Sequence, residues 1–321
     1  TMHVVALAQS GAAGHLLLTG GVGRHPPSEA AVMRGVAERA GVAASRLVLE
    51  ETAIDAVGRA MFSMPLIGRA SQIGGLLREY FKGAARGSVW DFLAESHESH
   101  GWTLGQRRSW SRRWFAEIDR LVSTRRALPK TQDLPADVLD LLLAARDSQT
   151  GAPLSDKDIR DQVATMVATG FESTARTLFW AVYMLACDPE EQGRIRAEVT
   201  AAEPDGVNRL AGLTAWPRLT GVLNETMRLY PSVSTLTRMA KRPDEIGGAK
   251  VRPGNLVIVS PWVMHRHHRL WDQPDAFLPE RFVEHPERMR DEAFIPFGVG
   301  RRICIGAAFA TTEASLLLAQ L

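Results

Sequence analysis

Cysteine is scarce in this sequence of 321 residues, which contains only Cys187 and Cys304. Two thiols cannot form a disulfide framework, so the sequence favours a reducing compartment and we expect a cytoplasmic protein. An excess of charge of one sign is also lacking, because 38 Lys and Arg residues stand against 36 Asp and Glu residues. We therefore expect no nucleic-acid partner. The apolar fraction of 45% and the charged fraction of 23% are ordinary for a soluble globular protein.

Long hydrophobic runs are missing as well. The most apolar stretch, residues 163–187, is interrupted by Glu172 and Arg176, and its longest uncharged piece covers residues 177–187. This piece is well short of the ~20 residues that a membrane-spanning helix needs. The first residues also lack the basic region and the small-residue cleavage site of a secretory signal. We therefore expect no membrane segment.

The first fifty residues combine short apolar runs with one helical pattern. Strand, helix and strand are expected, in this order, over residues 15–19, 28–40 and 46–50. The turn after the first strand is glycine-rich, but a phosphate-binding G-x-G-x-x-G pattern starting at Gly21 would need a glycine where Pro26 stands. The pattern therefore predicts a plain βαβ unit. This region resembles a piece of the YdcF-like family, at residues 18–21, 27–30 and 49–52.

From Thr52 onward the spacing of apolar residues is mainly helical. Helical segments are expected near residues 76–94, 106–126, 137–146, 189–202 and 219–230. A capping box formed by Ser155 and Asp158 predicts the start of a helix that continues to Cys187, over about 32 residues or ~48 Å. Alternation over residues 250–260 predicts a small hairpin. The expected fold class is mainly α, with a small β component and a βαβ appendage at the N-terminus.

The strongest chemical signal is a glycine-punctuated loop that delivers Cys304 to the start of a helix. Gly298 and Gly300 allow a tight turn and the close approach of a flat partner, because they carry no side chain. The adjacent arginines and the helix N-terminus both stabilise a thiolate, which is the metal-binding form of cysteine. The alternative for a lone cysteine is a small buried hydrophobic residue. From Phe297 to Gly306 the sequence reads F-G-V-G-R-R-I-C-I-G.

This passage matches, at every specified position, the F-x-x-G-x-R-x-C-x-G loop of the cytochrome P-450 family, and the resemblance extends over residues 52–321. It implies a heme b (iron protoporphyrin IX) cofactor whose iron is bound by Cys304. It also implies that Arg238 and Arg302 bind the heme propionates, since guanidinium groups suit carboxylates. The cofactor-binding residues predicted in this way are Arg238, Phe297, Gly298, Gly300, Arg302 and Gly306.

Two further motifs extend the resemblance upstream of the cysteine. Glu225 and Arg228 match the family's E-x-x-R motif, and residues three apart on a helix share a face and can pair. Residues 279–282, Pro-Glu-Arg-Phe, match the loop whose arginine, Arg281, completes this pair as a triad. Alone, an E-x-x-R pattern is usually a solvated pair. Upstream of Cys304 it predicts a structural triad that fixes geometry more than it adds stability, because burying charges costs desolvation.

Residues 169–174, Thr-Gly-Phe-Glu-Ser-Thr, align with the family's [AG]-G-x-[DE]-T-[TS] motif. In the family, the glycine opens a groove for oxygen, and the acid and alcohol relay protons to it. Thr169 and Ser173 depart from the usual residues, and serine loses the methyl group that restricts the rotamer of threonine. The alternative is a polar notch in a core helix. The predicted catalytic residues are Glu172, Ser173 and Thr174.

Two other features are given structural interpretations. The run of residues 265–268, His-Arg-His-His, looks like a metal cluster, but adjacent histidines diverge on a strand or turn. A surface loop is therefore favoured for this run. Cys187, at the end of the long predicted helix, is most simply explained by core packing.

The resemblance implies a heme-thiolate monooxygenase that inserts one oxygen atom from O2 into an apolar small-molecule substrate. Electrons are expected from NAD(P)H through a separate reductase or ferredoxin, since no flavin, nicotinamide or iron–sulfur motif is present. Residues 1–51 are expected to be a YdcF-like βαβ fragment, and residues 52–321 a partial cytochrome P-450 domain. The family's helices before residue 52 and its last hairpins are not recognisable. A non-catalytic or heme-deficient fragment or fusion is therefore the alternative, and we expect the chain to bind heme weakly or not at all.

A second alternative is a YdcF-like enzyme defined by the first fifty residues. One βαβ unit cannot bury both faces of a sheet, and such an enzyme would need a complete sheet. No activity is therefore attached to residues 1–51.

Overall fold

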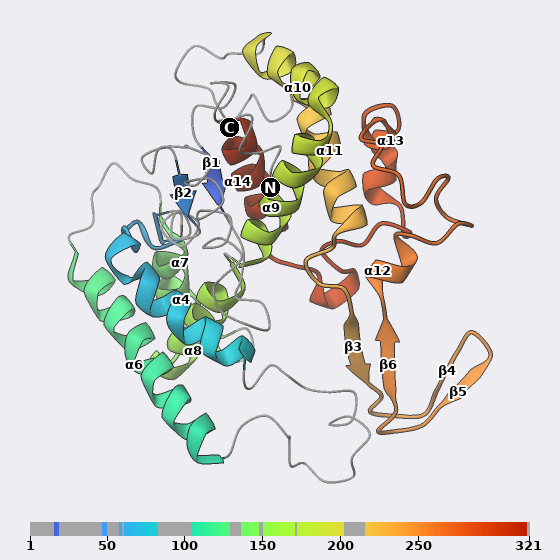
Figure 1. The fold of residues 1–321 in the computed structure, drawn as a ribbon. Coiled ribbons are helices and arrows are strands. Elements are labelled where there is room, and N and C mark those ends of the chain that lie inside the picture. The colour runs from blue at the N-terminus through green and yellow to red at the C-terminus, as the bar shows by residue number, and fades with distance from the viewer. Residues whose placement is uncertain are drawn as a thin grey trace. The chain divides into compact units, whose positions relative to one another are not determined.

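The computed structural model describes the chain in segments, which are residues 16–18, 47–49, 58–59, 61–82, 104–128, 136–147, 150–170, 172–201 and 216–319. They fall into two compact units. We call residues 173–201 and 216–319 the C-terminal unit, and the described residues from 58 to 172 the middle unit. Most described residues are helical and the strands are short, so the mainly α fold with a small β component is confirmed (Figure 1).

The middle unit is helical in its described part, with α4 (Ile67–Lys82), α6 (Leu104–Ala127), α7 (Val138–Ala144) and α8 (Asp156–Gly170). Helix α6 packs against α4 and α8, and it buries Trp114 and Ile118, which are one helical turn apart. Arg125 of α6 donates to Asp137 across 2.7 Å. Asp137 is also the N-cap of α7, where it accepts the backbone N–H of Asp140 (2.9 Å). One aspartate thus starts α7 and attaches it to α6.

Helix α8 begins with the predicted capping box. The hydroxyl of Ser155 accepts the backbone N–H of Asp158 (3.2 Å), and the carboxylate of Asp158 accepts the N–H of Ser155 (3.3 Å). The reciprocal pair satisfies donors that the first turn of a helix leaves without a partner.

The single long helix predicted up to Cys187 is not what the described residues show. Helix α8 has 15 residues and ends at Gly170, and α9 (Glu172–Cys187) has 16 residues. Residue 171, between them, lies outside the described residues. Gly170 is the last residue of α8, and glycine is ~1 kcal/mol less favourable than alanine inside a helix. The hydroxyl of Thr169 also donates back to the carbonyl of Thr165 (2.8 Å), a bond that tends to bend helices.

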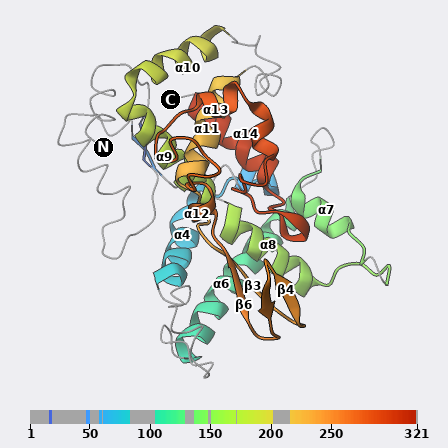
Figure 2. The ribbon, with the colours of Figure 1, turned by 90° about the vertical axis from the view of Figure 1, so that its right-hand side faces the viewer.

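The C-terminal unit contains the remaining described helices and most of the strands. Its longer helices are α9, α10 (Pro189–Ala201), α11 (Pro217–Leu229) and α14 (Ala307–Ala319). Its short elements are β3 (Leu236–Met239), β4 (Asp244–Ile246), β5 (Ala249–Val251), β6 (Leu256–Val259), α12 (Pro261–Met264), α13 (Glu280–Val283), and the 3-10 turns η3 (Pro286–Arg290) and η4 (Gly300–Arg302). Figures 1 and 2 both show the four strands at one end of this unit, away from α10.

Helix α11 is the centre of the C-terminal unit. It packs against α10, α12, α13 and α14, and its residues from Gly221 to Leu229 are all buried. Gly221 allows α13 to come close, because a Cβ atom at this position would lie 2.8 Å from a methyl of Val283 and 2.9 Å from the carbonyl oxygen of Pro279. The helix predicted over 219–230 is therefore present, and it is surrounded by protein.

The strands pair differently from the prediction. Two strands occur where the hairpin over residues 250–260 was expected, but β5 pairs with β4 and β6 pairs with β3, both in antiparallel fashion. The turn between β5 and β6 is bonded to the chain after β3, since Gly254 donates to the carbonyl of Ala240 (2.8 Å) and Ala240 donates to that of Asn255 (2.9 Å). These long-range bonds replace the hairpin, which is a wrong prediction.

Near the N-terminus, β1 (Leu16–Leu18) and β2 (Leu47–Leu49) form a two-stranded sheet. Both strands fall within the predicted runs 15–19 and 46–50, whereas the helix predicted over 28–40 lies outside the described residues. Among the described helices, none has the length and apolar character required to cross a membrane.

Candidate functional site

The loop that presents Cys304 is closed by its own backbone. Gly298 and Gly300 both have φ of +72°, in the left-handed region that residues with a side chain rarely adopt. The N–H of Cys304 donates to the carbonyl of Phe297 across 2.9 Å, and the N–H of Ile303 donates to that of Gly300 across 3.1 Å. Immediately afterwards α14 starts, and its first turn begins with Ala307. The predicted glycine turn before a helix is therefore present.

The outer face of this loop is open in the described structure. Cys304 is exposed, and apolar side chains around it in the sequence are exposed too: Val299 by 59%, Ile303 by 54% and Ile305 by 86%. Arg302 is exposed and makes no ion pair with a described residue. A thiol, apolar side chains and a free guanidinium are what a flat, apolar, anionic metal complex requires of a protein surface. The residues present fit heme.

Strand β3 (Leu236–Met239) begins next to this loop and carries a second arginine. Leu236, the first residue of β3, is the side chain that lies nearest to Gly298, 3.8 Å from where a Cβ atom would be. Arg238 follows on the same strand, is exposed, and donates to the carbonyl of its neighbour Thr237 (2.8 Å). Its guanidinium therefore still has donors available for a carboxylate.

The inner face of the loop is anchored in a buried cluster. Phe297 packs against a group of buried residues, which are Met227, Trp271, Phe282, Ala293 and Phe294. The N–H of Ile295 donates to Nε2 of His265 across 2.9 Å, and His265 has no exposed surface. Burial lowers the pKa of His265 to about 4, so the ring is neutral and can accept this bond.

His265 therefore corrects the surface-loop interpretation of residues 265–268. The imidazole is an internal support of the cysteine loop. Of the three histidines, His267 is half-buried and only His268 is exposed. No cluster of three candidate metal ligands occurs in the part of the chain that the structure describes. The core-packing interpretation of Cys187 is also wrong, because Cys187 is exposed at the end of α9.

The three residues of the predicted triad lie together behind the loop. Arg228 donates to both oxygens of Glu225 (2.7 and 2.8 Å), and both side chains are fully buried. The remaining donors of Arg228 reach the carbonyls of His265, Pro274 and Ala276 at 2.6 to 2.9 Å. Nε of Arg281 lies 3.4 Å from Glu225. Arg228 thus connects α11 to the segment that carries His265, and His265 connects this segment to the cysteine loop.

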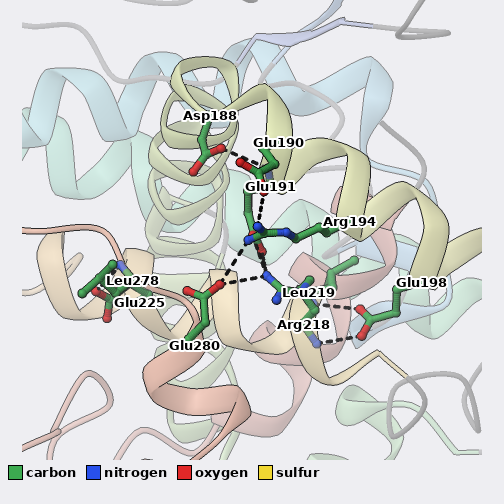
Figure 3. A network of polar contacts seen from close by, with 10 residues as sticks. All are labelled: Asp188, Glu190, Glu191, Arg194, Glu198, Arg218, Leu219, Glu225, Leu278 and Glu280. Atoms are coloured by element: carbon green, nitrogen blue, oxygen red, sulfur yellow. Dashed lines mark hydrogen bonds and ion pairs between the residues drawn. The ribbon is translucent and has the colours of Figure 1, made fainter.

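A second polar network, which sequence reasoning missed, joins α10, α11 and α13 (Figure 3). Arg218 donates to Glu191 (2.7 Å) and to Glu280 (3.2 Å), and Arg194 bonds to Glu190, Glu191 and Glu280. The two oxygens of Glu198 accept the N–H groups of Arg218 and Leu219 (2.8 and 3.0 Å). A carboxylate of α10 therefore caps α11. Partners so distant in the sequence leave no local spacing by which they could be recognised.

The predicted catalytic residues begin α9. Glu172 and Ser173 are half-buried and Thr174 is buried. Ser232 donates to the carbonyl of Ser173 (2.9 Å) and contacts the hydroxyl of Thr177 (3.0 Å), which attaches this turn to the chain after α11. Ser173 and Thr174 thus belong to the same compact unit as Cys304.

One buried acid that faces this turn was also missed. Glu313 of α14 is 8% exposed, and neither of its carboxyl oxygens has a hydrogen bond of good geometry in the described structure. Burial raises the pKa of Glu313 to about 7, and the nearby hydroxyl of Thr174 opposes this rise. The available signal was a single charge within the otherwise uncharged helix from Ala307 to Ala319.

A sequence model described as "Cytochrome P450" matches residues 36–321. The chain belongs to the cytochrome P450 family. The match includes all the predicted site residues and begins at residue 36, ahead of the predicted domain start at Thr52, which stays a prediction. The YdcF-like resemblance of residues 1–51 finds no support in the comparisons.

Individual P450 relatives agree with this assignment. Cyclooctatin synthase of Streptomyces melanosporofaciens is 38% identical over 188 residues, which are 58% of this chain and 40% of that protein. Cytochrome P450 4V2 of Mus musculus is 37% identical over 186 residues, 56% of this chain and 35% of that protein. The crystal structure of a cytochrome P450, CYP102L1, superposes with a TM-score of 0.69 at 26% identity, and covers 84% of this chain and 59% of that one. This chain therefore spans less than half the length of cyclooctatin synthase and of cytochrome P450 4V2.

Proposed function

We propose that this chain carries the heme-binding core of a monooxygenase that inserts one oxygen atom of O2 into an apolar small molecule. The observation that supports it is the exposed thiol of Cys304 on a loop whose inner face is fastened by His265 and the Glu225–Arg228 pair. A rigid support behind an exposed thiolate is what a metal ligand needs, since ligand position sets affinity and reactivity.

Each residue of the loop has a separate task in this proposal. Cys304 supplies the thiolate that binds iron, Arg302 and Arg238 bind the propionates, and Ile303 and Ile305 cover apolar surface of the macrocycle. When bound, heme b supplies the reduction of O2 and the transfer of one of its oxygen atoms to substrate carbon. The other oxygen atom leaves as water, which takes two electrons and two protons. We assign the electrons to NAD(P)H through a reductase or ferredoxin.

The first turn of α9 moves these protons. Glu172 is half-buried, so its carboxylate can exchange protons with water and pass them to the hydroxyl of the half-buried Ser173. The carbonyl of Ser173 accepts a hydrogen bond from Ser232 (2.9 Å), which fixes the backbone of the turn. Thr174, buried next to it, is the third hydroxyl-bearing or acidic group of this turn. We place the activity in the cytoplasm, where two exposed thiols stay reduced.

A heme-deficient fragment is the second candidate, and the open outer face of the loop favours it. Heme that leaves a few hundred Å² of apolar edge uncovered loses several kcal/mol at ~25 cal/mol per Å². This loss corresponds to several orders of magnitude in affinity. The chain spans less than half the length of the two relatives above.

The experiment that separates the two candidates is a titration of the purified chain with hemin, followed by absorbance and by size-exclusion chromatography. Stoichiometric binding, with a thiolate-type CO difference band after reduction, supports the monooxygenase core. This band should disappear in Cys304→Ala and persist in Cys187→Ala, a matched control because both thiols are exposed. A band that survives in both variants would remove Cys304 from the proposal, and the absence of binding in the parent chain would favour the fragment.

A further inference from the structure

Glu313 differs from the other buried acids of the C-terminal unit. Glu191 and Glu225 are 2% and 0% exposed, and each carboxylate is bonded to an arginine at 2.7 Å. Glu313 is nearly as buried, at 8%, but both of its oxygens lack a well-formed hydrogen bond among the described residues. An unpaired buried carboxylate is expensive, whereas the protonated carboxyl is neutral and costs much less.

The charges around Glu313 do not favour its ionised form. It is the only ionisable residue of α14, a helix of 13 residues. Helix α11 packs against α14, but its charges, Arg218, Glu225 and Arg228, are engaged in the ion pairs described above. On α9, Arg176 is exposed and Glu172 is itself acidic. Burial is accordingly the main cause of the raised pKa, which lies at about 7.

The polar side chain that faces Glu313 is Thr174 of α9, which is 4% exposed. The carboxyl of Glu313 and the hydroxyl of Thr174 can form a hydrogen bond in two ways, which differ in the group that donates. A protonated carboxyl donates its O–H to the threonine oxygen, and the threonine hydrogen then points elsewhere. A carboxylate has no hydrogen, so the threonine hydroxyl must turn and donate to it. The state of one buried acid therefore decides the direction of the neighbouring hydroxyl.

We propose that Glu313 is a positioning residue that carries a proton in the folded protein and thereby sets whether Thr174 donates or accepts. The link from this pair to oxygen chemistry rests on the proposed function of the α9 turn, but the shared proton does not. Near neutral pH both states are populated, so the pair responds to pH in the range where the enzyme is expected to work.

The test is infrared spectroscopy of the full chain without added hemin, as a difference spectrum between about pH 6, where ordinary carboxyl groups are ionised, and about pH 9. We expect a carbonyl band from one protonated carboxyl that disappears with a midpoint at about pH 7 and is absent from Glu313→Gln. Glu172→Gln, at the half-buried acid of the same turn, should keep the band. A band that is unaffected by Glu313→Gln, or no such band in the parent chain, overturns the proposal.

A second variant tests the partner and remains informative if Glu313→Gln does not fold. Thr174→Val keeps the side-chain shape and removes the hydroxyl, so the frequency and midpoint of the band should shift. Thr311→Val is the matched control, because the hydroxyl of Thr311 bonds within α14 to the carbonyl of Ala307 (2.9 Å). Equal spectra for Thr174→Val and the parent would rule out the pairing. Hemin plays no part in this measurement, so a failure to bind heme and a failure of this inference are distinguishable.

Discussion

The two faces of the cysteine loop contrast sharply in how they are held. On the inner face, His265 and Arg228 have no exposed surface and their contacts run to backbone groups of several segments. On the outer face, Ile305 is 86% exposed and Cys304 is exposed as well. The inner face is completed by the chain itself, and the outer face has the composition of a surface that another group covers. The residues that hold the loop in place therefore differ from the residues that we propose bind heme. Substitutions on the inner face should change the free energy of unfolding, and substitutions on the outer face should change heme binding.

The largest effect on the free energy of unfolding should come from the inner face. Glu225→Ala leaves the buried guanidinium of Arg228 without its carboxylate, and breaking a buried pair in this way costs about 3–5 kcal/mol. Urea titration followed by circular dichroism measures the loss. Glu190→Ala is the control, because its pair with Arg194 is largely exposed and should contribute under about 1 kcal/mol. Similar losses in both variants would contradict the comparison.

The next effect is a pH dependence that is hidden in the parent protein. The pKa of His265 falls from 6.5 to about 4, so the stability linked to its neutral form is lost as pH decreases from 6.5 towards 4. The pKa of Glu313 rises from 4.5 to about 7, so the stability linked to its protonated form is lost as pH increases over that range. Between pH 4.5 and 6.5, His265 therefore makes the free energy of unfolding rise with pH, whereas Glu313 makes it fall.

Replacing either His265 or Glu313 should reveal the pH dependence of stability that the other residue causes. This dependence reaches about 1.4 kcal/mol per pH unit, or roughly 3 kcal/mol between pH 4.5 and 6.5. In Glu313→Gln stability should rise with pH between 4.5 and 6.5. In His265→Gln, which keeps an acceptor for Ile295, it should fall. Urea midpoints at several pH values measure both slopes. Slopes of the same sign in the two variants would show that one of these groups does not titrate as described.

A smaller effect is expected where α11 and α13 meet. Gly221→Ala places a Cβ atom 2.8 Å from Val283 and 2.9 Å from the carbonyl of Pro279, an overpacking that typically costs about 1–3 kcal/mol. Gly193→Ala is the matched control at an exposed position of α10, where nothing lies within 4 Å of the added Cβ atom, and it should gain up to about 1 kcal/mol from helix propensity. Thermal unfolding of both variants gives the sign directly, and a gain in Gly221→Ala would argue against the close contact.

The smallest effect on stability belongs to the outer face. Cys304→Ala and Ile305→Thr should each change the free energy of unfolding by less than about 0.5 kcal/mol, because both side chains are exposed. Hemin titration should nevertheless separate them from the parent, with loss of the thiolate-type CO band in the first and weaker binding in the second. A large destabilisation by either would place the residue on the inner face.

Local patterns were readable from the sequence, and distant partners were not. The capping box of Ser155 and the spacing of Glu225 and Arg228 depend on three-residue intervals, and the pairs are present. The burial of His265 depends on Arg228 and Ile295, which are 37 and 30 residues away from it. The pairing of β6 with β3 in place of β5 has the same origin, since register follows long-range contacts. Glu313 was overlooked because a single acid on an apolar helix has no spacing to match.

The two exposed cysteines also give the protein an internal reference for chemical labelling. Cys187 lies at the end of α9 and Cys304 lies on the loop, so an alkylating reagent reaches both. Any group that covers the loop shields one thiol and leaves the other reactive. The ratio of doubly to singly alkylated chains in a mass spectrum then reports the occupancy of the loop, without a chromophore and without calibration against a second protein.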